Sequence, residues 1–188
     1  MFMLILASAS PRRRELMEKL HRPYLCEPAV LPEIIPDGTA PQDVPQCLAR
    51  HKAREILEKH RTDADMPIVI GSDTVVIADG TILGKPKDAE DAKRMLRMLS
   101  GKSHQVLTGV SILSPDKEVS FTASTDVEFY PLSDTQISAY VAGGEPMDKA
   151  GAYGIQGDGA LLVKEIRGDY YTVMGFPIAR IARELEIL

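Results

Sequence analysis

The feature that most constrains this 188-residue chain is the alternation of short apolar runs with longer segments whose apolar residues recur every three to four positions. The short runs are typical of buried strands and the longer segments of amphipathic helices, so their order predicts an α/β fold. At this length we expect one domain over residues 1–188, or a single fold with two small lobes.

The pattern also predicts the position of each element. Asp79-Gly80 predicts a hairpin turn, and the polar residues after Gly71 predict a break between two strands. The Gly-rich stretch Gly143–Gly159 is expected to be a long loop. We expect strands at Phe2–Ala7, Tyr24–Val30, Pro67–Gly71, Thr74–Ala78, Thr81–Leu83, His104–Leu113 and Val119–Phe129, and helices at Pro11–Leu20, Pro41–Glu58, Asp88–Leu99, Ser133–Val141 and from Pro177, with further segments at Ala160–Ile166 and Tyr170–Val173.

Composition excludes several classes of protein. Apolar residues make up 44% and charged residues 26% of the chain, as in globular proteins. The apolar run Met1–Ala7 is far shorter than the roughly 20 residues of a membrane span. A net charge of −5 argues against nonspecific nucleic-acid binding, and two cysteines without CxxC spacing argue against a zinc site. We therefore expect a cytoplasmic protein that binds neither membrane nor nucleic acid.

The segment from Ser8 to Arg13 is the first candidate binding site. A predicted strand ends in small residues, and a helix capped by Ser10 begins with Arg12 and Arg13 in its first turn. Amide groups and the positive dipole end of a helix N-terminus attract anions, and serine and arginine side chains add donors, so this segment suits phosphate. An ordinary capped helix with solvated arginines explains the segment alone equally well.

A carboxylate inside an apolar stretch is the second candidate. Asp73 stands between the apolar runs Ile68–Ile70 and Val75–Ala78, although Asp is disfavoured in strands. Its position indicates a turn, a bulge, or a partly desolvated carboxylate that holds a metal or takes a proton from water. On this segment alone, a turn is the more common explanation.

Two lysines and one glutamine complete the candidates. Pro86 keeps Lys85 out of helical geometry, so its ammonium can face a cleft, and Lys52 lies on a predicted helix. Most isolated lysines are simply solvated. In the Gly-rich stretch, the amide of Gln156 can read donors and acceptors on a base edge, and a plain flexible loop remains the alternative.

Six strings resemble, in order and spacing, the motifs of the Maf family, also called septum formation inhibitor proteins. The strings are LASASPRR, GSDTVV, LGKP, MLRMLSGKSHQVLTGV, EPMDKAGAYGIQG and GDYYTVMGFP, and they extend over nearly the whole chain. The resemblance implies a fold related to the inosine triphosphatases, with a long mixed sheet flanked by helices and two lobes around a nucleotide cleft. It also implies metal-dependent cleavage of a nucleoside triphosphate to a monophosphate and pyrophosphate.

The resemblance also implies roles for individual residues. Asp73 matches the proton acceptor, and the pattern at Arg12, Thr74 and Gln156 is similar to the branch that cleaves dTTP and UTP. A divalent cation, Mg²⁺ or Mn²⁺, suits carboxylate and phosphate ligands. We expect catalytic roles for Asp73, Lys52 and Lys85, metal binding by Glu33 and Asp73, and substrate binding by Ser8, Arg12, Arg13, Thr74, Lys149 and Gln156.

Two alternatives stay open at this point. The protein can be a nucleotide-binding regulator of cell division whose turnover is unimportant, although pure binding does not require a base such as Asp73. It can also act mainly on modified pyrimidine nucleotides, with dTTP and UTP as surrogates. A nucleoside triphosphate is the expected partner in each case, and a homodimer would be ordinary for such a fold.

Overall fold

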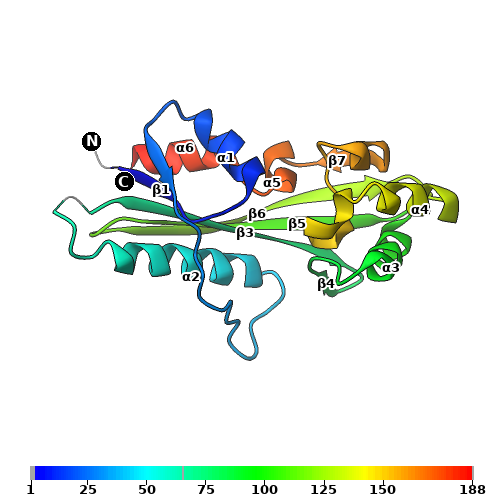
Figure 1. Ribbon diagram of the computed structural model, residues 1–188, viewed down its shortest axis with the longest axis horizontal. Helices are drawn as coiled ribbons and strands as arrows, with labels where there is room; N and C mark the ends of the chain where they lie inside the picture. Colours follow the sequence, from blue (N-terminus) through cyan, green and yellow to red (C-terminus); the bar gives the residue numbers. More distant parts are fainter. Residues whose placement is uncertain (1–2, 65, 188) are drawn as a thin grey trace. The chain divides into compact units, whose positions relative to one another are not determined.

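The computed structural model describes residues 3–64 and 66–187, so Phe2, where we expect the first strand to begin, lies outside the described residues. These residues form a mixed α/β fold (Figure 1). In chain order the elements are β1 (Leu4–Leu6), α1 (Pro11–Glu18), β2 (Tyr24–Cys26), α2 (Val44–Lys59), β3 (Ile68–Ala78), β4 (Thr81–Leu83), α3 (Ala89–Leu99), β5 (Ser103–Leu113), β6 (Glu118–Phe129), α4 (Asp134–Ala142), η1 (Glu145–Asp148), η2 (Ala150–Ala152), η3 (Asp158–Leu161), β7 (Val163–Arg167), α5 (Tyr170–Met174) and α6 (Ile178–Glu186).

The described strands form a seven-stranded sheet in the order β2-β1-β3-β5-β6-β7, with β4 paired to β3. Strand β1 runs parallel to β2 and β3, whereas β4 and β7 run antiparallel to β3 and β6. The sheet is therefore mixed and flanked by helices, and the predicted fold class is confirmed. None of the described helices is both long and apolar enough to cross a membrane.

The chain divides into two compact units, which are described in turn. Unit 1 comprises Met1–Asp73, Thr108–Ala123 and Gly175–Leu188, and unit 2 comprises Thr74–Leu107 and Ser124–Met174. Strands β3, β5 and β6 contribute residues to both units because each of them contains a boundary between the two.

Unit 1 is built on the parallel strands β2, β1 and β3. Helix α2 lies on one side of these strands, and α1 and α6 lie on the other (Figure 1). All three residues of β1 are buried, as expected for a parallel strand covered on both faces. Ser10 caps α1 as predicted, and Pro11 occupies its first turn. One core cluster of this unit consists of Ile5, Ala7, Ala53, Ile56, Val69 and Leu113.

Strand β3 corrects one sequence-based prediction. The expected break between Gly71 and Thr74 is wrong, since Ile68–Ala78 is one continuous strand. The buried hydroxyl of Ser72 donates to the carbonyl oxygens of Gly109 and Gly175, at 3.1 Å and 3.0 Å, so burying this polar side chain leaves no unpaired group. The turn interpretation of Asp73 is therefore also wrong.

Gly71 stands where β3 passes closest to α2. A Cβ atom at this position would lie 2.1 Å from the carbonyl oxygen of Ala49 and 2.9 Å from the backbone nitrogen of Ala53. Only a residue without a side chain allows the helix to approach the strand this closely.

Unit 2 has its own core around α3 and α4, which pack against each other. The predicted hairpin is confirmed: Asp79 and Gly80 both have positive φ, and they connect β3 to β4. The side-chain oxygens of Asp88 and Ser133 cap α3 and α4 by accepting the backbone N–H groups of Asp91 and Gln136.

The last third of the chain is more regular than its glycine content predicts. The expected long loop at Gly143–Gly159 contains the short 3₁₀ turns η1 and η2 and the start of η3. Strand β7 begins at Val163, later than the expected segment at Ala160, because Ala160 belongs to η3. The segment at Tyr170 is the short helix α5.

We predict that Gly71→Ala destabilises the protein by about 1–3 kcal/mol or more, because the added methyl group must displace the backbone of α2. Urea denaturation measures this loss. Gly84→Ala is the control: a Cβ atom there meets nothing within 4 Å, so its effect should stay within about 0.5 kcal/mol. Equal stability of the two variants would contradict the close approach of α2 to β3.

Candidate functional site

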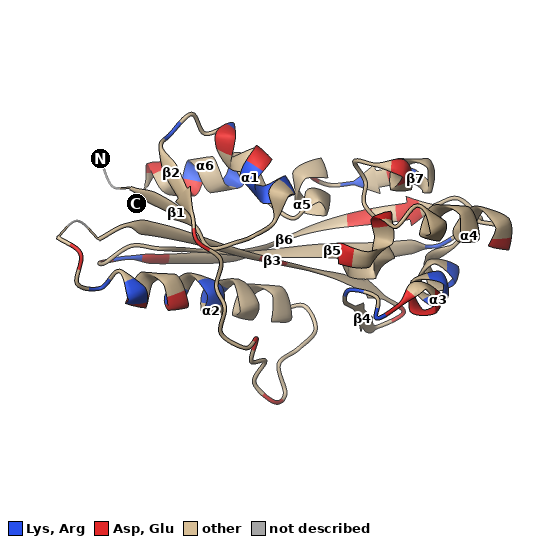
Figure 2. Ribbon diagram, viewed as in Figure 1, with Lys and Arg blue, Asp and Glu red and all other residues tan. Residues whose placement is uncertain are grey.

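The end of β1 and the start of α1 form a preorganised cluster of donors in unit 1. The hydroxyl oxygen of Ser8 accepts hydrogen bonds from the Ser10 backbone N–H and from Nη1 of Arg13, both at 3.2 Å. Nε of Arg13 donates to the carbonyl oxygen of Gly175 at 2.9 Å. Two hydrogen bonds therefore fix the guanidinium of Arg13 beside the N-terminus of α1. Figure 2 shows basic residues at the start of α1 and along α2.

Neighbouring charged groups of the same unit affect the pKa of Arg13. Burial lowers the pKa of Arg13, and the negative charges of Asp73 and Glu33 raise it, whereas Arg12 lowers it. Arginine is not deprotonated in proteins, so Arg13 keeps its positive charge. Arg12, Glu33 and Asp73 thus each lie close enough to Arg13 to influence its charge.

Lys52 brings two carboxylates together. Its ammonium nitrogen lies 2.5 Å from Oδ1 of Asp73 and 2.8 Å from Oε1 of Glu33. The side chains of Lys52 and Asp73 are only 18% and 14% exposed, so water screens their ion pair less than it would on an open surface. Glu33 is more accessible, with 53% of its side chain exposed. Three segments of unit 1 therefore meet at the Lys52 ammonium.

The carbonyl oxygen of Gly175 connects the two clusters. It accepts hydrogen bonds from Arg13 and from the hydroxyl of Ser72, the residue before Asp73. Sequence reasoning assigned no role to Ser72 or Gly175. The only signal was their presence in the strings GSDTVV and GDYYTVMGFP. The residue types serine and glycine do not by themselves predict a contact with a residue so distant in sequence.

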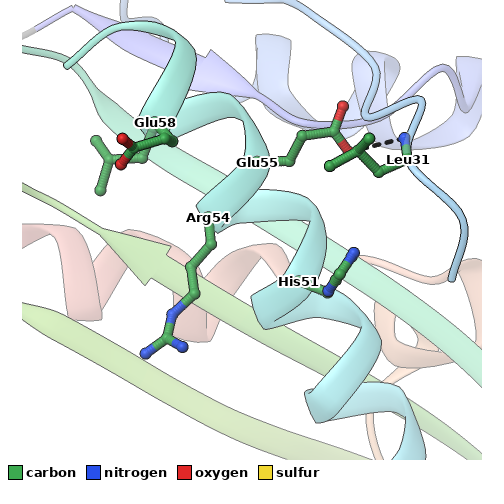
Figure 3. A pocket seen from close by; sticks show the side chains of 6 residues that line it. Leu31, His51, Arg54, Glu55 and Glu58 are labelled. Atoms are coloured by element: carbon green, nitrogen blue, oxygen red, sulfur yellow. Dashed lines mark hydrogen bonds between the residues drawn. The ribbon is translucent and has the colours of Figure 1, made fainter. Parts of the chain in front are cut away.

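Helix α2 also fixes the segment that leads to Glu33. The carboxylate of Glu55 accepts the backbone N–H group of Val30 at 2.8 Å. It also accepts the backbone N–H group of Leu31 at 3.0 Å (Figure 3). Its side chain is 4% exposed, and Lys59 pairs with it at 3.2 Å. Burial raises the pKa of Glu55, but the two backbone hydrogen bonds and Lys59 outweigh that effect and lower it overall. Sequence reasoning missed Glu55, since it looks like any charged helix residue.

A pocket of about 450 Å³ opens beside Glu55 and Leu31 (Figure 3). None of the predicted site residues lines it. The Nε2 atom of His51 is buried there and has no hydrogen-bond partner among the described residues. The pocket therefore belongs to the packing of α2 against the preceding segment and not to the cluster around Lys52. Its lining residues are Leu31, His51, Arg54, Glu55, Leu57 and Glu58.

The remaining predicted site residues belong to unit 2. Thr74 follows Asp73 in β3 and is partly buried, whereas Lys85 and Gln156 are exposed. The ammonium of Lys149 donates to the carbonyl oxygen of Glu145 at 2.6 Å and to Asp148 at 2.7 Å, so it contacts its own segment. Within this unit, the Gly151 backbone N–H donates to the carbonyl oxygen of Gly84, the residue before Lys85, at 3.0 Å.

The acidic residues of unit 1 suit a cation that arrives with a polyphosphate. Within residues 3–64 and 66–187, no group of three or more His, Cys, Asp or Glu side chains is arranged to hold a metal ion. Glu33 and Asp73 nevertheless face one point, the Lys52 ammonium. Because Mg²⁺ is usually held by one or two carboxylates together with substrate phosphates, two carboxylates fit such an ion.

Comparisons of the whole sequence identify related proteins. Residues 3–188 match the family model described as Maf-like protein. A dTTP/UTP pyrophosphatase of Bacillus velezensis is 51% identical over 183 residues, which cover 97% of this chain and 95% of that protein. A dTTP/UTP pyrophosphatase of Bacillus cytotoxicus is 49% identical over 182 residues, covering 97% of this chain and 93% of that protein.

Solved structures resemble the chain in fold. A HAM1 protein from Coxiella burnetii has a TM-score of 0.54 at 15% identity, with both chains fully covered. The Ham1 protein of Staphylococcus aureus has a TM-score of 0.54 at 14% identity, with 98% of each chain covered. At such identities the likeness supports the fold alone.

We predict that Glu55→Gln lowers the free energy of unfolding by about 1–3 kcal/mol. In the variant, the amide nitrogen of the glutamine would face one of the two backbone N–H groups, which would then lack an acceptor. Hydrogen exchange at Leu31 should also become faster. Glu58→Gln is the matched control on the same helix, since the Glu58 side chain is 70% exposed and pairs with Arg61, which is also exposed. An unchanged exchange rate in the Glu55 variant would contradict the anchoring role.

Proposed function

The chain belongs to the Maf-like protein family, and from this membership we propose that it hydrolyses dTTP and UTP to the nucleoside monophosphate and pyrophosphate. The observation that carries the proposal is the placement of Asp73 within reach of Arg13 and in contact with Lys52. A nucleotide pyrophosphatase needs both a base for water and cations for the phosphates, and this cluster supplies both. The relatives named dTTP/UTP pyrophosphatase, about half identical over nearly the full length, support the choice of substrate.

In the proposed reaction, water attacks the α-phosphorus, and the bond between that phosphorus and the oxygen bridging to the β-phosphate breaks. Asp73 takes the proton from the attacking water. Its Oδ1 is held by Lys52, so we assign Oδ2 as the proton acceptor. Such general base catalysis typically contributes about 10²–10⁴-fold, and positioning and electrostatic stabilisation supply the rest.

The phosphates are held by groups that the fold prepares in advance. The N-terminus of α1, the hydroxyl of Ser8 and the guanidinium of Arg13 offer hydrogen bonds and positive charge to the triphosphate. Ser8 accepts two hydrogen bonds through its oxygen, which leaves its own hydrogen as a donor to an anion. We propose that Arg12 and Lys85 add positive charge and that Lys149 also contacts the substrate.

We propose that Glu33 and Asp73 hold a divalent cation, Mg²⁺ or Mn²⁺. When bound, such an ion offsets the negative charge of the phosphates. When no metal ion is bound, the ammonium of Lys52 offsets the negative charge of the two carboxylates, since it pairs with both. We further propose that Thr74 and Gln156 contact the nucleoside and favour pyrimidines, and that the protein works in the cytoplasm.

The products of the reaction test the proposal directly. Incubation with dTTP, UTP and GTP in the presence of Mg²⁺ should release pyrophosphate and a monophosphate, fastest from dTTP and UTP. Phosphorus NMR distinguishes pyrophosphate from orthophosphate. Release of orthophosphate would place the cleavage at another bond, and the absence of any product would favour a nucleotide-binding regulator.

We predict that Asp73→Asn lowers kcat by about 10²–10⁴-fold, because the amide keeps the shape of the side chain but cannot take the proton. Binding of dTTP, measured by calorimetry, should stay detectable because the groups around Arg13 are retained. Asp79→Asn is the control, since Asp79 is exposed in the β3–β4 turn and pairs with Lys102. Near-normal turnover by Asp73→Asn would remove Asp73 from the role of base.

A further inference from the structure

The carboxylate of Glu145 organises the segment between α4 and β7. Its Oε1 accepts the hydroxyl of Tyr140 at 2.9 Å and the backbone N–H of Gly159 at 3.3 Å. Its Oε2 accepts the backbone N–H of Asp158 at 2.8 Å. A carboxylate on a mobile surface loop would be solvated, whereas both oxygens of Glu145 are bonded to groups of its own unit. The charge of Glu145 therefore has a structural use.

Tyr140 extends this network to the other side of Gln156. Its hydroxyl donates to Glu145 and accepts the backbone N–H of Gly154 at 3.1 Å. Burial raises the pKa of Tyr140 far above its ordinary value, and the Glu145 carboxylate raises it further, so the hydroxyl keeps its proton. Glu145 and Tyr140 thus accept hydrogen bonds from backbone N–H groups on both sides of Gln156: Gly154 before it, and Asp158 and Gly159 after it.

Three glycines let the backbone pack closely against Glu145, Tyr140 and Lys149. A Cβ atom at Gly157 would lie 2.3 Å from Oε2 of Glu145, and one at Gly159 would lie 2.8 Å from the Tyr140 hydroxyl oxygen. A Cβ atom at Gly154 would lie 2.5 Å from Cε of Lys149. We name residues 153–159 the Gln156 loop. The Gln156 side chain itself is exposed, so the loop is fixed from beneath while it presents this amide to solvent.

We propose that Glu145 is a positioning residue for nucleobase selection, because its carboxylate holds the Gln156 loop in the conformation that presents the Gln156 amide. The proposal rests on the proposed function, in which Gln156 contacts the base. An amide selects between bases only if its donor and acceptor ends keep one orientation relative to the ligand. Fixing the loop before binding also lowers the ordering cost of that contact.

The variant Glu145→Gln tests this role. Its amide nitrogen must face at least one N–H or O–H donor, so at least one of the three hydrogen bonds is lost. We expect the ratio of kcat/KM for dTTP to that for GTP to fall about tenfold, the order of one hydrogen bond. The KM for dTTP should rise, while kcat should change by less than about threefold, because Asp73 and Lys52 are not in this network. Hydrogen exchange at Gly154, Asp158 and Gly159 should become faster.

Matched variants separate this role from simple loss of folding. Glu165→Gln makes the same chemical change in β7, where Glu165 pairs with Arg167 at the surface, and it should keep the wild-type ratio. Tyr140→Phe keeps the buried ring and removes only the hydroxyl, so it should lower the ratio even if Glu145→Gln folds poorly. In a Gln156→Ala background, Glu145→Gln should lower the ratio no further, since the group that it positions is already absent.

The outcomes distinguish the two proposals. If the wild-type protein releases no pyrophosphate from dTTP, the proposed function fails. If Gln156→Ala lowers the ratio and Glu145→Gln and Tyr140→Phe do not, Glu145 has no part in base selection. Equal losses of kcat/KM for dTTP and GTP in the Glu145 variant, with an unchanged ratio, would also overturn the inference, because a merely structural role affects both substrates alike.

Discussion

The ammonium of Lys52 lies between two carboxylates, Asp73 at 2.5 Å and Glu33 at 2.8 Å, and the rest of unit 1 is arranged so that this contact can form. Like charges so close would repel one another without a cation between them. One lysine thus keeps the proposed base, Asp73, and the proposed metal ligand, Glu33, together. The same negative charge that attracts Lys52 would attract the proposed divalent cation.

That contact depends on how closely α2 approaches β3. Gly71 removes the side chain that would otherwise hold the helix away, and Ser72 satisfies its buried hydroxyl with carbonyl groups. One turn beyond Lys52, Glu55 binds two backbone amides ahead of Glu33. A single helix therefore supplies the central cation of the cluster and anchors the segment that carries one of its carboxylates.

Unit 2 uses a similar device for a different purpose. There the carboxylate of Glu145 and the hydroxyl of Tyr140 bind backbone amides around Gln156. In both units a partly or fully buried glutamate, Glu55 or Glu145, accepts hydrogen bonds from backbone N–H groups of an irregular segment. Such segments lack the regular hydrogen bonds of helices and strands, so side-chain acceptors fix their conformation.

The sequence by itself determined the order of elements, because apolar periodicity, caps such as Ser10 and Ser133 and the Asp79-Gly80 turn are local signals. It also supplied the family resemblance and the candidates Asp73, Lys52, Arg13 and Glu33. Only the tertiary structure decided that Asp73 lies inside an unbroken strand. The residues that contact Ser72 and Gly71, such as Gly109 and Ala49, are far away in the chain, so no local signal predicts these contacts. The tertiary structure alone gave Glu55, Glu145 and Gly175 their contacts, because a hydrogen bond between distant segments leaves no periodic trace in a sequence.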